Sequence, residues 1–278
     1  MATVNKKNIW ASVVYLRKFK EISKAVQLVA IAKLRKLTKS LESREHSLYL
    51  SVEMFDELND TEQYSKCTLV VITSERSCCG KLNSEVLSAA KDSIDSYLDE
   101  NKILNIISVG WKGRDSLSSK YKSEIVKSVS EASKVSFFLS YVITLCIFDT
   151  DFDKCAIYFS KYYKIFEQLA AVYEFSSFSI FFDYIYNHRK DNLFFDLLIS
   201  NCLLSLRSLY NYNVCLIVLD AFDETKYSEL GCRAFSMEMA HRNATDLIQE
   251  KMLIYNKARQ AGITNDLLEV VAGAIYTV

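Results

Sequence analysis

The segment SERSCCGKLN, at residues 74–83, contains a Gly-Lys pair of the kind found in phosphate-binding loops, formed here by Gly80 and Lys81. In such a loop another glycine stands five residues before that pair's glycine, and a Ser or Thr after the lysine reaches magnesium. Glu75 and Leu82 occupy those two positions. The backbone cradle for phosphates and the hydroxyl for magnesium are both missing, so no nucleotide site is predicted here.

Other residue types that catalyse reactions or bind metals are scattered along the chain. GWKG, at residues 110–113, lacks the spacing of a dinucleotide fingerprint, and His46, His188 and His241 are too far apart in sequence to indicate a cluster. The eight cysteines stand at positions 67, 78, 79, 146, 155, 202, 215 and 232. A zinc site usually shows paired CxxC spacing, so we interpret these residues as reduced thiols in a reducing compartment. No catalytic residue, metal or cofactor is predicted.

Charge is balanced in total but uneven along the chain. The 278 residues carry 34 basic and 34 acidic side chains, which argues against a protein that coats nucleic acid with its whole surface. Within residues 6–39 the only acid is Glu21, against a long series of basic residues. These are Lys6, Lys7, Arg17, Lys18, Lys20, Lys24, Lys33, Arg35, Lys36 and Lys39.

Three interpretations of this basic segment are open: a solvated helix face, a surface for nucleic-acid phosphates, or a surface that faces acidic groups of a partner protein. Residues 25–34, AVQLVAIAKL, are apolar nearly all round a helix. A helix of that kind is enclosed on several sides, whereas a helix that binds nucleic acid keeps one face bare. We therefore favour enclosure in a protein sleeve with acidic groups at its mouth.

Long helices are predicted at both ends of the chain. There is no proline, and no glycine precedes Gly80, so residues 6–58 contain no strong breaker and show apolar residues at helical spacing. At 1.5 Å per residue a helix of about 50 residues is about 75 Å long, which exceeds a small globular core. Residues 225–278 show the same spacing. Two such helices at opposite ends predict an antiparallel coiled coil.

Between these ends, short apolar runs alternate with helix-like segments, which is typical of a mostly parallel α/β sheet. Strands are predicted at 67–73, 103–110 and 155–160, with a further strand at 177–186. Helices are predicted at 83–100, at 132–148 and, leading into the last helix, at 193–222. The predicted fold class is α/β, with a Rossmann-like domain at 61–222 between coiled-coil helices at 1–60 and 223–278.

No segment is predicted to span a membrane. The most hydrophobic run, residues 135–148, is shorter than the roughly 20 residues that a spanning helix needs. The first residues lack a long apolar core of the kind that a secretory signal has.

The two ends of the chain resemble the gamma subunit of F-type ATP synthases, the rotor of the central stalk. The family's first helix carries a Thr-Lys-Ala-Met-x-Met-Val-Ala-x-x-Lys-like signature, matched here within SKAVQLVAIAKLRKL, with Val26 in place of a Met. The closing stretch matches at Tyr255, Asn256, Ala258, Arg259, Gln260, Ile263, Thr264 and Glu269. Such a set at fixed spacing is highly specific.

Two further segments agree with this resemblance. SELGCRAFSMEMAHRNA is similar to the family's approach to the last helix, and SERSCCGKLN resembles its Asp-Arg-Gly-Leu-Cys-Gly-Gly-Leu-Asn segment after the first strand. In the second segment Glu75 replaces the Asp, and Ser77 and Lys81 replace glycines. Good matches cover about a third of the chain, at both ends and in the family's order.

The resemblance implies a non-catalytic subunit whose paired helices enter a hexamer of α and β subunits. Arg259 and Gln260 match residues that contact β-subunit loops, and Thr264 belongs to the same motif. Lys24 and Lys33 match basic residues that face acidic β segments, and Val278 ends an apolar tip held in an apolar bearing. The remaining partners are the c-ring and the small stalk subunits, called delta and epsilon.

The resemblance also implies a location at the membrane surface. Bacterial, plastid and mitochondrial relatives share these ends. The absence of proline and the abundance of Tyr, Phe, Ile and Lys favour a divergent mitochondrial chain, peripheral to the inner membrane on its matrix side. Two alternative functions are a basic coiled-coil protein that binds nucleic acid, and a small-molecule enzyme built on the α/β core.

Overall fold

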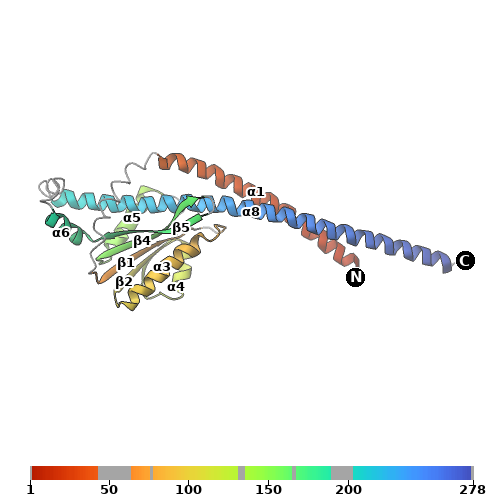
Figure 1. Cartoon of the computed structure of the whole chain (residues 1–278), viewed down its shortest axis with the longest axis horizontal. Coiled ribbons are helices and arrows are strands. Elements are labelled where there is room, and N and C mark those ends of the chain that lie inside the picture. Colours follow the sequence, from red (N-terminus) through yellow and green to blue (C-terminus); the bar gives the residue numbers. More distant parts are fainter. Residues whose placement is uncertain are drawn as a thin grey trace. The chain divides into compact units, whose positions relative to one another are not determined.

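The computed structural model describes residues 2–42, 64–75, 78–130, 135–164, 167–188 and 203–276. The chain forms two compact units, and each is described by itself. One unit comprises Ala32–Cys232, and the other comprises Met1–Ile31 together with Arg233–Val278. Figure 1 labels the elements of both.

The larger unit is built on a five-stranded sheet with the order β3-β2-β1-β4-β5. Its strands are β1 (Lys66–Ile72), β2 (Ile103–Val109), β3 (Ile125–Val129), β4 (Lys154–Lys164) and β5 (Glu167–Ser176). The first four strands run parallel, and β5 is antiparallel to β4. The predicted α/β class with a mostly parallel sheet is confirmed.

Helices cover both faces of the sheet, which is why its central strands are apolar without alternation. They are α3 (Leu82–Asp99), α4 (Trp111–Ser118), α5 (Phe137–Phe148), α6 (Phe178–His188) and the first part of α8 (Leu203–Tyr276). Side chains of β1 point alternately into two cores. Val70 and Ile72 pack with residues of α5, α6 and α8, whereas Leu69 and Val71 pack with residues of α3 and α4.

The strands predicted at 67–73, 103–110 and 155–160 correspond to β1, β2 and β4, and the helix predicted at 83–100 corresponds to α3. The helix predicted at 132–148 is α5, which begins at Phe137. Residues 193–202 lie outside the described part of the chain, and from Leu203 onward the predicted helix is the start of α8. Similarly, α1 is described over Ala2–Glu42, so the prediction for 43–58 falls outside it.

The strand predicted at 177–186 is wrong, because this segment forms α6. Its aromatic and β-branched residues favour a strand by propensity. However, Phe178, Phe181, Phe182 and Ile185 follow the helical period, and all four pack on the core beneath α5 and α8. Burial of that one face decides the conformation, as tertiary packing often does against local propensity.

A hydroxyl and two glycines join the ends of β1 and β2. Thr73 donates its backbone N–H and its hydroxyl hydrogen to the carbonyl oxygen of Val109, at 2.9 Å each, and its Oγ1 accepts the N–H of Gly113 at 2.9 Å. Gly110 has a φ of 94°, and a Cβ there would lie 2.4 Å from the carbonyl oxygen of Thr73. The GWKG segment is therefore a packing element, because only glycine allows β1 and the β2–α4 turn to approach so closely.

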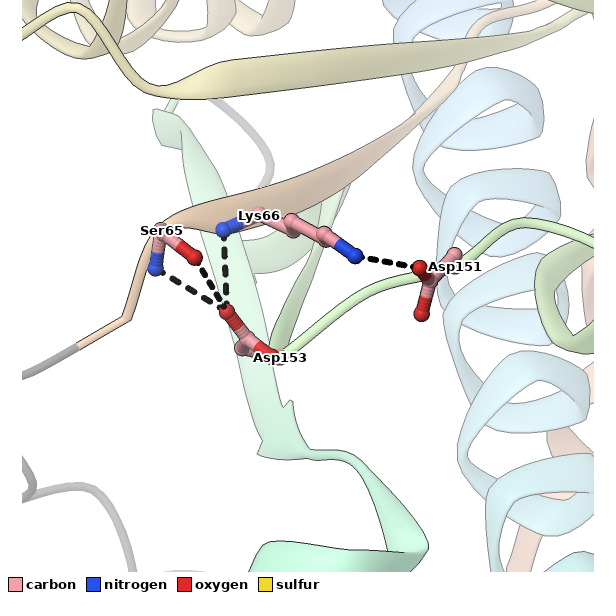
Figure 2. Close-up of polar contacts among 4 residues, drawn as sticks. All are labelled: Ser65, Lys66, Asp151 and Asp153. Carbon is pink, nitrogen blue, oxygen red and sulfur yellow. Dashed lines mark hydrogen bonds and ion pairs between the residues drawn. The ribbon is translucent and has the colours of Figure 1, made fainter.

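A carboxylate ties together the starts of β1 and β4 (Figure 2). Oδ2 of Asp153 accepts the backbone N–H groups of Ser65 and Lys66 at 2.9 and 3.0 Å, and the hydroxyl of Ser65 at 3.1 Å. The ammonium of Lys66 pairs with the neighbouring Asp151. Burial opposes ionisation of Asp153, but the two N–H donors and the hydroxyl outweigh it and lower the pKa of this carboxyl.

The first part of α8 is tied to the sheet by buried polar contacts as well as apolar ones. The Tyr210 hydroxyl donates to the carbonyl oxygen of Ser176 at 2.6 Å, and the hydroxyls of Ser160 and Ser228 lie 2.9 Å apart. The Tyr173 hydroxyl donates to Asp220 at 2.7 Å. Burial raises the pKa of Asp220, although this hydrogen bond opposes the shift.

No helix among the described residues is long and apolar enough to cross a membrane. None of the cysteines in the described ranges forms a disulfide. The domain limits predicted at residues 60 and 222 stay a prediction. The compact units are defined differently, by contacts within each unit, and the larger one ends at Cys232.

We expect Gly110→Ala to lower the free energy of unfolding by about 2–4 kcal/mol, because the new methyl group meets a backbone oxygen and the residue must keep a positive φ. Urea unfolding of the full chain, followed by circular dichroism, measures this. Gly262→Ala on α8 is the matched control: a Cβ there meets nothing within 4 Å, so a gain of up to about 1 kcal/mol is expected. A Gly110→Ala chain as stable as the wild type would contradict this role.

Stability should depend on pH through Asp153. Its folded pKa lies below the unfolded value, so its contribution is complete above the unfolded pKa and disappears as pH falls through the folded pKa. Asp153→Asn should lower the free energy of unfolding by about 1 kcal/mol near neutral pH, because the partly solvated carboxylate contributes less than a fully buried one. The variant should also lose less stability than the wild type as the pH falls into the acid range. Thermal melts across acid pH test this, with the exposed Asp115→Asn as control. If Asp153→Asn and the wild type lost stability equally as the pH falls, this role of Asp153 would be excluded.

Candidate partner-binding surface of the helical pair

The smaller unit consists of α1 up to Ile31 and α8 from Arg233, packed antiparallel. Nε2 of Gln27 donates to Glu238 at 3.4 Å, Nδ1 of His241 lies 3.1 Å from the carbonyl oxygen of Lys20, and the rings of Trp10 and Tyr255 are 5.2 Å apart. Residue numbers fall along α1 as they rise along α8. The predicted antiparallel pairing of the two terminal helices is confirmed.

The contact seam follows a coiled-coil repeat. The less exposed residues of α1 recur at alternating steps of three and four, and so do those of α8. On α1 they are Val13, Leu16, Lys20, Ser23, Gln27 and Ala30. On α8 they are Met237, His241, Ala244, Ile248, Lys251, Tyr255 and Ala258. Half of the α1 seam is polar, and the α8 seam contains two alanines.

This seam is a weak source of stability. The hydroxyl of Ser23 is buried without a hydrogen-bond partner among the described residues, which costs about 1–3 kcal/mol. Burial of alanine contributes much less than burial of leucine or isoleucine. The pair therefore buries only some of its large apolar side chains, such as Val13 and Ile248, in its own interface.

Those large side chains point outward instead. On α1, Tyr15 and Ile22 are 72% and 61% exposed, with Phe19, Leu28 and Val29 also exposed. On α8, the exposed apolar residues are Leu253, Ile254, Ile263, Leu267, Leu268, Val270, Val271 and Ile275. Exposed apolar surface of this extent marks a surface that a partner covers. Leu28 and Val29 belong to residues 25–34, for which enclosure by a partner stays a prediction.

A groove of about 590 Å³ runs between α1 and α8. Its basic walls come from Arg17, Lys20 and Lys24, with Glu21 as the acid of the lining. The ammonium of Lys24 donates to Oε1 of Gln27 at 3.1 Å. This places the charge of Lys24 at the edge of the seam, where an acidic partner group can reach it.

A polar network that the sequence analysis did not identify crosses the seam beside Lys24. Gln27 links Lys24 to Glu238, and Glu238 also pairs with Arg242 one turn along α8. Two features of the sequence pointed towards this network. Gln27 is a polar residue within an otherwise apolar stretch, and Glu238 and Arg242 have the i, i+4 spacing of a helical ion pair. Without knowledge of the helix register, neither predicts a contact between the two ends of the chain.

The remaining predicted contact residues lie on separate parts of the helices. Gln260 and Thr264 are exposed one turn apart, and the Thr264 hydroxyl donates to the carbonyl oxygen of Gln260 at 3.0 Å. Arg259 is exposed beside them, far along α8 from the groove that contains Lys24. Lys33 is exposed on α1 beyond Ile31, in the part assigned to the other unit. Val278 lies outside the described residues.

The end of α8 continues past the start of α1 (Figure 1). Since Trp10 lies opposite Tyr255, the first residue of α1 comes level with about residue 263. Every residue described from Ile263 to Ile275 is exposed. The last charge in this stretch is Glu269, after which the helix carries Val270, Val271, Ile275 and small residues. The tip is a single, apolar, uncharged helix end.

Comparisons with known proteins agree over nearly the whole chain. A family model described as ATP synthase matches residues 5–275. The ATP synthase gamma chain of Pelagibacter ubique is 30% identical, over 91% of this chain and 93% of its own length.

Solved structures agree in fold. A chain from the OSCP/F1/c-ring structure of the Euglena gracilis mitochondrial ATP synthase in rotational state 3 superposes with a TM-score of 0.88 at 21% identity, covering 99% of this chain and 95% of that chain. A chain from the rotor of the same organism's enzyme in rotational state 1 gives a TM-score of 0.80 at 21% identity, covering 94% and 99%.

Proposed function

Because the chain belongs to the ATP synthase gamma-chain family, we propose that it is the rotor shaft of the central stalk. In this role it couples proton-driven rotation of the membrane c-ring to conformational change at the catalytic β subunits. The single observation that supports this role best is the antiparallel helical pair, whose seam contains many small and polar residues while many large apolar side chains lie outside it. Such a pair requires a surrounding protein.

The surrounding protein is the hexamer of α and β subunits, and the pair of α1 and α8 lies within it. The larger unit carries the c-ring and the small stalk subunits, delta and epsilon. One Euglena gracilis structure with a chain similar to this one contains OSCP, F1 and the c-ring, which supports this assignment of partners. Functionally we divide the chain into shaft helices at 1–60 and 223–278 and a ring-holding domain at 61–222, the range that contains every described strand.

The uncharged end of α8 suits a tip that turns inside a ring. A buried, unpaired charge is costly, and it would favour one rotational angle. Apolar contact is non-directional, so it lets the tip turn with little angular preference. Val278 is the last residue of this tip, and we assign it to the apolar bearing.

Polar residues below the tip act at particular angles. Arg259 and Gln260 contact loops of a β subunit, and Thr264 shares the face of Gln260. Lys24 and Lys33 face acidic β segments at the mouth of the ring. Lys24 is supported by its place on a groove with basic walls, and Lys33 by its exposure on the same helix.

The chain is a non-catalytic subunit of the complex, and the chemistry of ATP belongs to the ring. It carries no catalytic residue of its own, since the Gly80 segment lacks a phosphate cradle and Gly110 and Gly113 serve the packing of β1 against β2. Neither a nucleic-acid-binding role nor a separate enzymatic role finds support among its relatives.

The subunit is peripheral to the membrane rather than embedded in it. We place it on the matrix side of the mitochondrial inner membrane. Two observations support this location: the chain has no proline and many Tyr, Phe, Ile and Lys residues, and its fold is similar to that of a chain in a mitochondrial complex.

Replacing both Arg259 and Gln260 by Ala should lower ATP synthesis by the assembled complex about three- to tenfold, because roughly 1 kcal/mol of angle-dependent contact is lost. Helix content and assembly should be unchanged, since both side chains are exposed. Synthesis by membrane vesicles at fixed proton-motive force measures this. Arg114→Ala, an exposed arginine on α4, is the control. A wild-type synthesis rate in the double variant would refute the contact role.

Ala274→Glu should impair assembly and turnover more than removal of residues 274–278. Deletion loses only apolar contact, whereas the substitution places a charge in the bearing. ATP hydrolysis by purified complexes and the yield of complex containing the chain measure the difference. Ala274→Val, which keeps the tip apolar, should behave like the wild type. If the deletion proved the more damaging change, the sleeve around the tip would be excluded.

A further inference from the structure

A buried amide joins the two helices of the smaller unit. The side chain of Gln27, on α1, is 6% exposed and lies in the seam with α8. Its Nε2 donates to Oε2 of Glu238 at 3.4 Å, and its Oε1 accepts from the ammonium of Lys24 at 3.1 Å. One end of the amide therefore contacts α8, and the other contacts a lysine of its own helix.

The chemistry of these two partners fixes the orientation of the amide. A lysine ammonium only donates hydrogen bonds, and a carboxylate only accepts them. If the amide of Gln27 turned over, its NH2 group would face the ammonium of Lys24, and its oxygen would face the carboxylate of Glu238. Both hydrogen bonds would be lost, so Gln27 has one favourable orientation.

Glu238 is itself held from its outer side. Its Oε1 accepts from the guanidinium of Arg242, one turn further along α8, while its Oε2 faces Gln27. The side chains of Arg242 and Glu238 are 67% and 40% exposed, so this ion pair contributes little to stability by itself. Its effect is geometric, because a carboxylate with one oxygen engaged on each side has a defined direction.

The charges around Lys24 do not favour one position of its ammonium. Arg17 and Lys20 line the same groove as like charges, and Glu21 is the acid of that lining. A lysine side chain loses more rotamer freedom than most when it is fixed. The hydrogen bond to Gln27 restricts these rotamers before a partner binds, so less entropy is lost in the contact with that partner.

We propose that Glu238 is a positioning residue for Lys24. Through the amide of Gln27 it orients the Lys24 ammonium at the edge of the seam, where an acidic group of a β subunit meets it at one rotational angle. This role rests on the proposed contact of Lys24 with the ring, and it requires no contact of Glu238 itself with the ring. In this way α8 controls a contact that α1 makes, and the two shaft helices act together at this level.

Variants that interrupt this relay should lower the rate of coupled turnover. Gln27→Met keeps a side chain of similar volume but lacks the amide, and Glu238→Ala leaves the amide free to turn over. Each should lower ATP synthesis by the assembled complex, at fixed proton-motive force, about two- to fivefold, the factor that one net hydrogen bond represents.

Two further variants are matched to Glu238→Ala. Glu238→Gln keeps an oxygen that can accept from Nε2 of Gln27, so it should recover most of the wild-type rate. Asp246→Ala removes an exposed carboxylate about two turns further along α8. It is the control and should leave the rate of synthesis unchanged.

A double-mutant cycle with Lys24→Ala separates positioning from a merely structural contact. Because Glu238 acts through Lys24, the single variant Lys24→Ala and the double variant with Glu238→Ala should synthesise ATP at the same reduced rate. A packing role would instead give additive losses, with a lower melting temperature of the complex in both backgrounds. Gln27→Met enters the same cycle, so the test stands even if Glu238→Ala assembles poorly.

The possible results distinguish this role from the proposed function. A wild-type rate in Lys24→Ala would reject the contact of Lys24 with the ring, and the positioning role with it. A reduced rate in Lys24→Ala, beside wild-type rates in both Glu238→Ala and Gln27→Met, would overturn the positioning role alone. Additive losses in the cycle would overturn it as well.

Discussion

The structure depends on how α1 and α8 pair. Their seam follows a coiled-coil repeat but contains several small and polar residues, including Ser23, Gln27, His241 and Ala244. Many of their large apolar side chains face outward. In an isolated coiled coil the opposite distribution gives stability, because burial of large apolar surface is the main favourable contribution. The free energy that a soluble coiled coil gains from its own seam is here left for contact with a surrounding protein, which is what a shaft that turns within a ring requires.

The first part of α8 is held firmly within the larger unit. Since α8 is a single helix of 74 residues, the residues that pack on the sheet and those that pair with α1 belong to one continuous element. Its first part lies over the sheet through Tyr210, Val214 and Phe222, with Ser228 and Gly231 at the closest approach. A long helix without proline transmits torque best if its base cannot slide. Burial of one side of the helix along several turns meets that condition.

The sequence predicted most of this architecture because its strongest signals are periodic and local. The breaker-free ends predicted α1 and α8, and the apolar runs predicted β1, β2 and β4. The edge strand β3 was missed because Lys127 and Ser128 interrupt its short apolar run, and α6 was taken for a strand because Phe and Ile favour strands by propensity. For the site, spacing identified exposed residues such as Arg259 and Gln260. It did not identify the contact of Gln27 with Glu238, which depends on the register between two helices more than 200 residues apart in sequence.

The antiparallel pairing of α1 with α8 is tested most directly by distances between spin labels. Labels attached through a non-canonical amino acid, with the native cysteines retained, are placed at the exposed residue Asn8 and at either Lys257 or Arg242. Asn8 is level with Lys257, and helices packed about 10 Å apart put these two labels on the order of 20 Å from each other. Arg242 lies about 22 Å further along the helix axis, so its label should be about 30 Å from Asn8. A narrow, shorter distance for Lys257 is the predicted result, and a reversed order or a broad distribution centred well beyond 30 Å for both pairs would contradict the account.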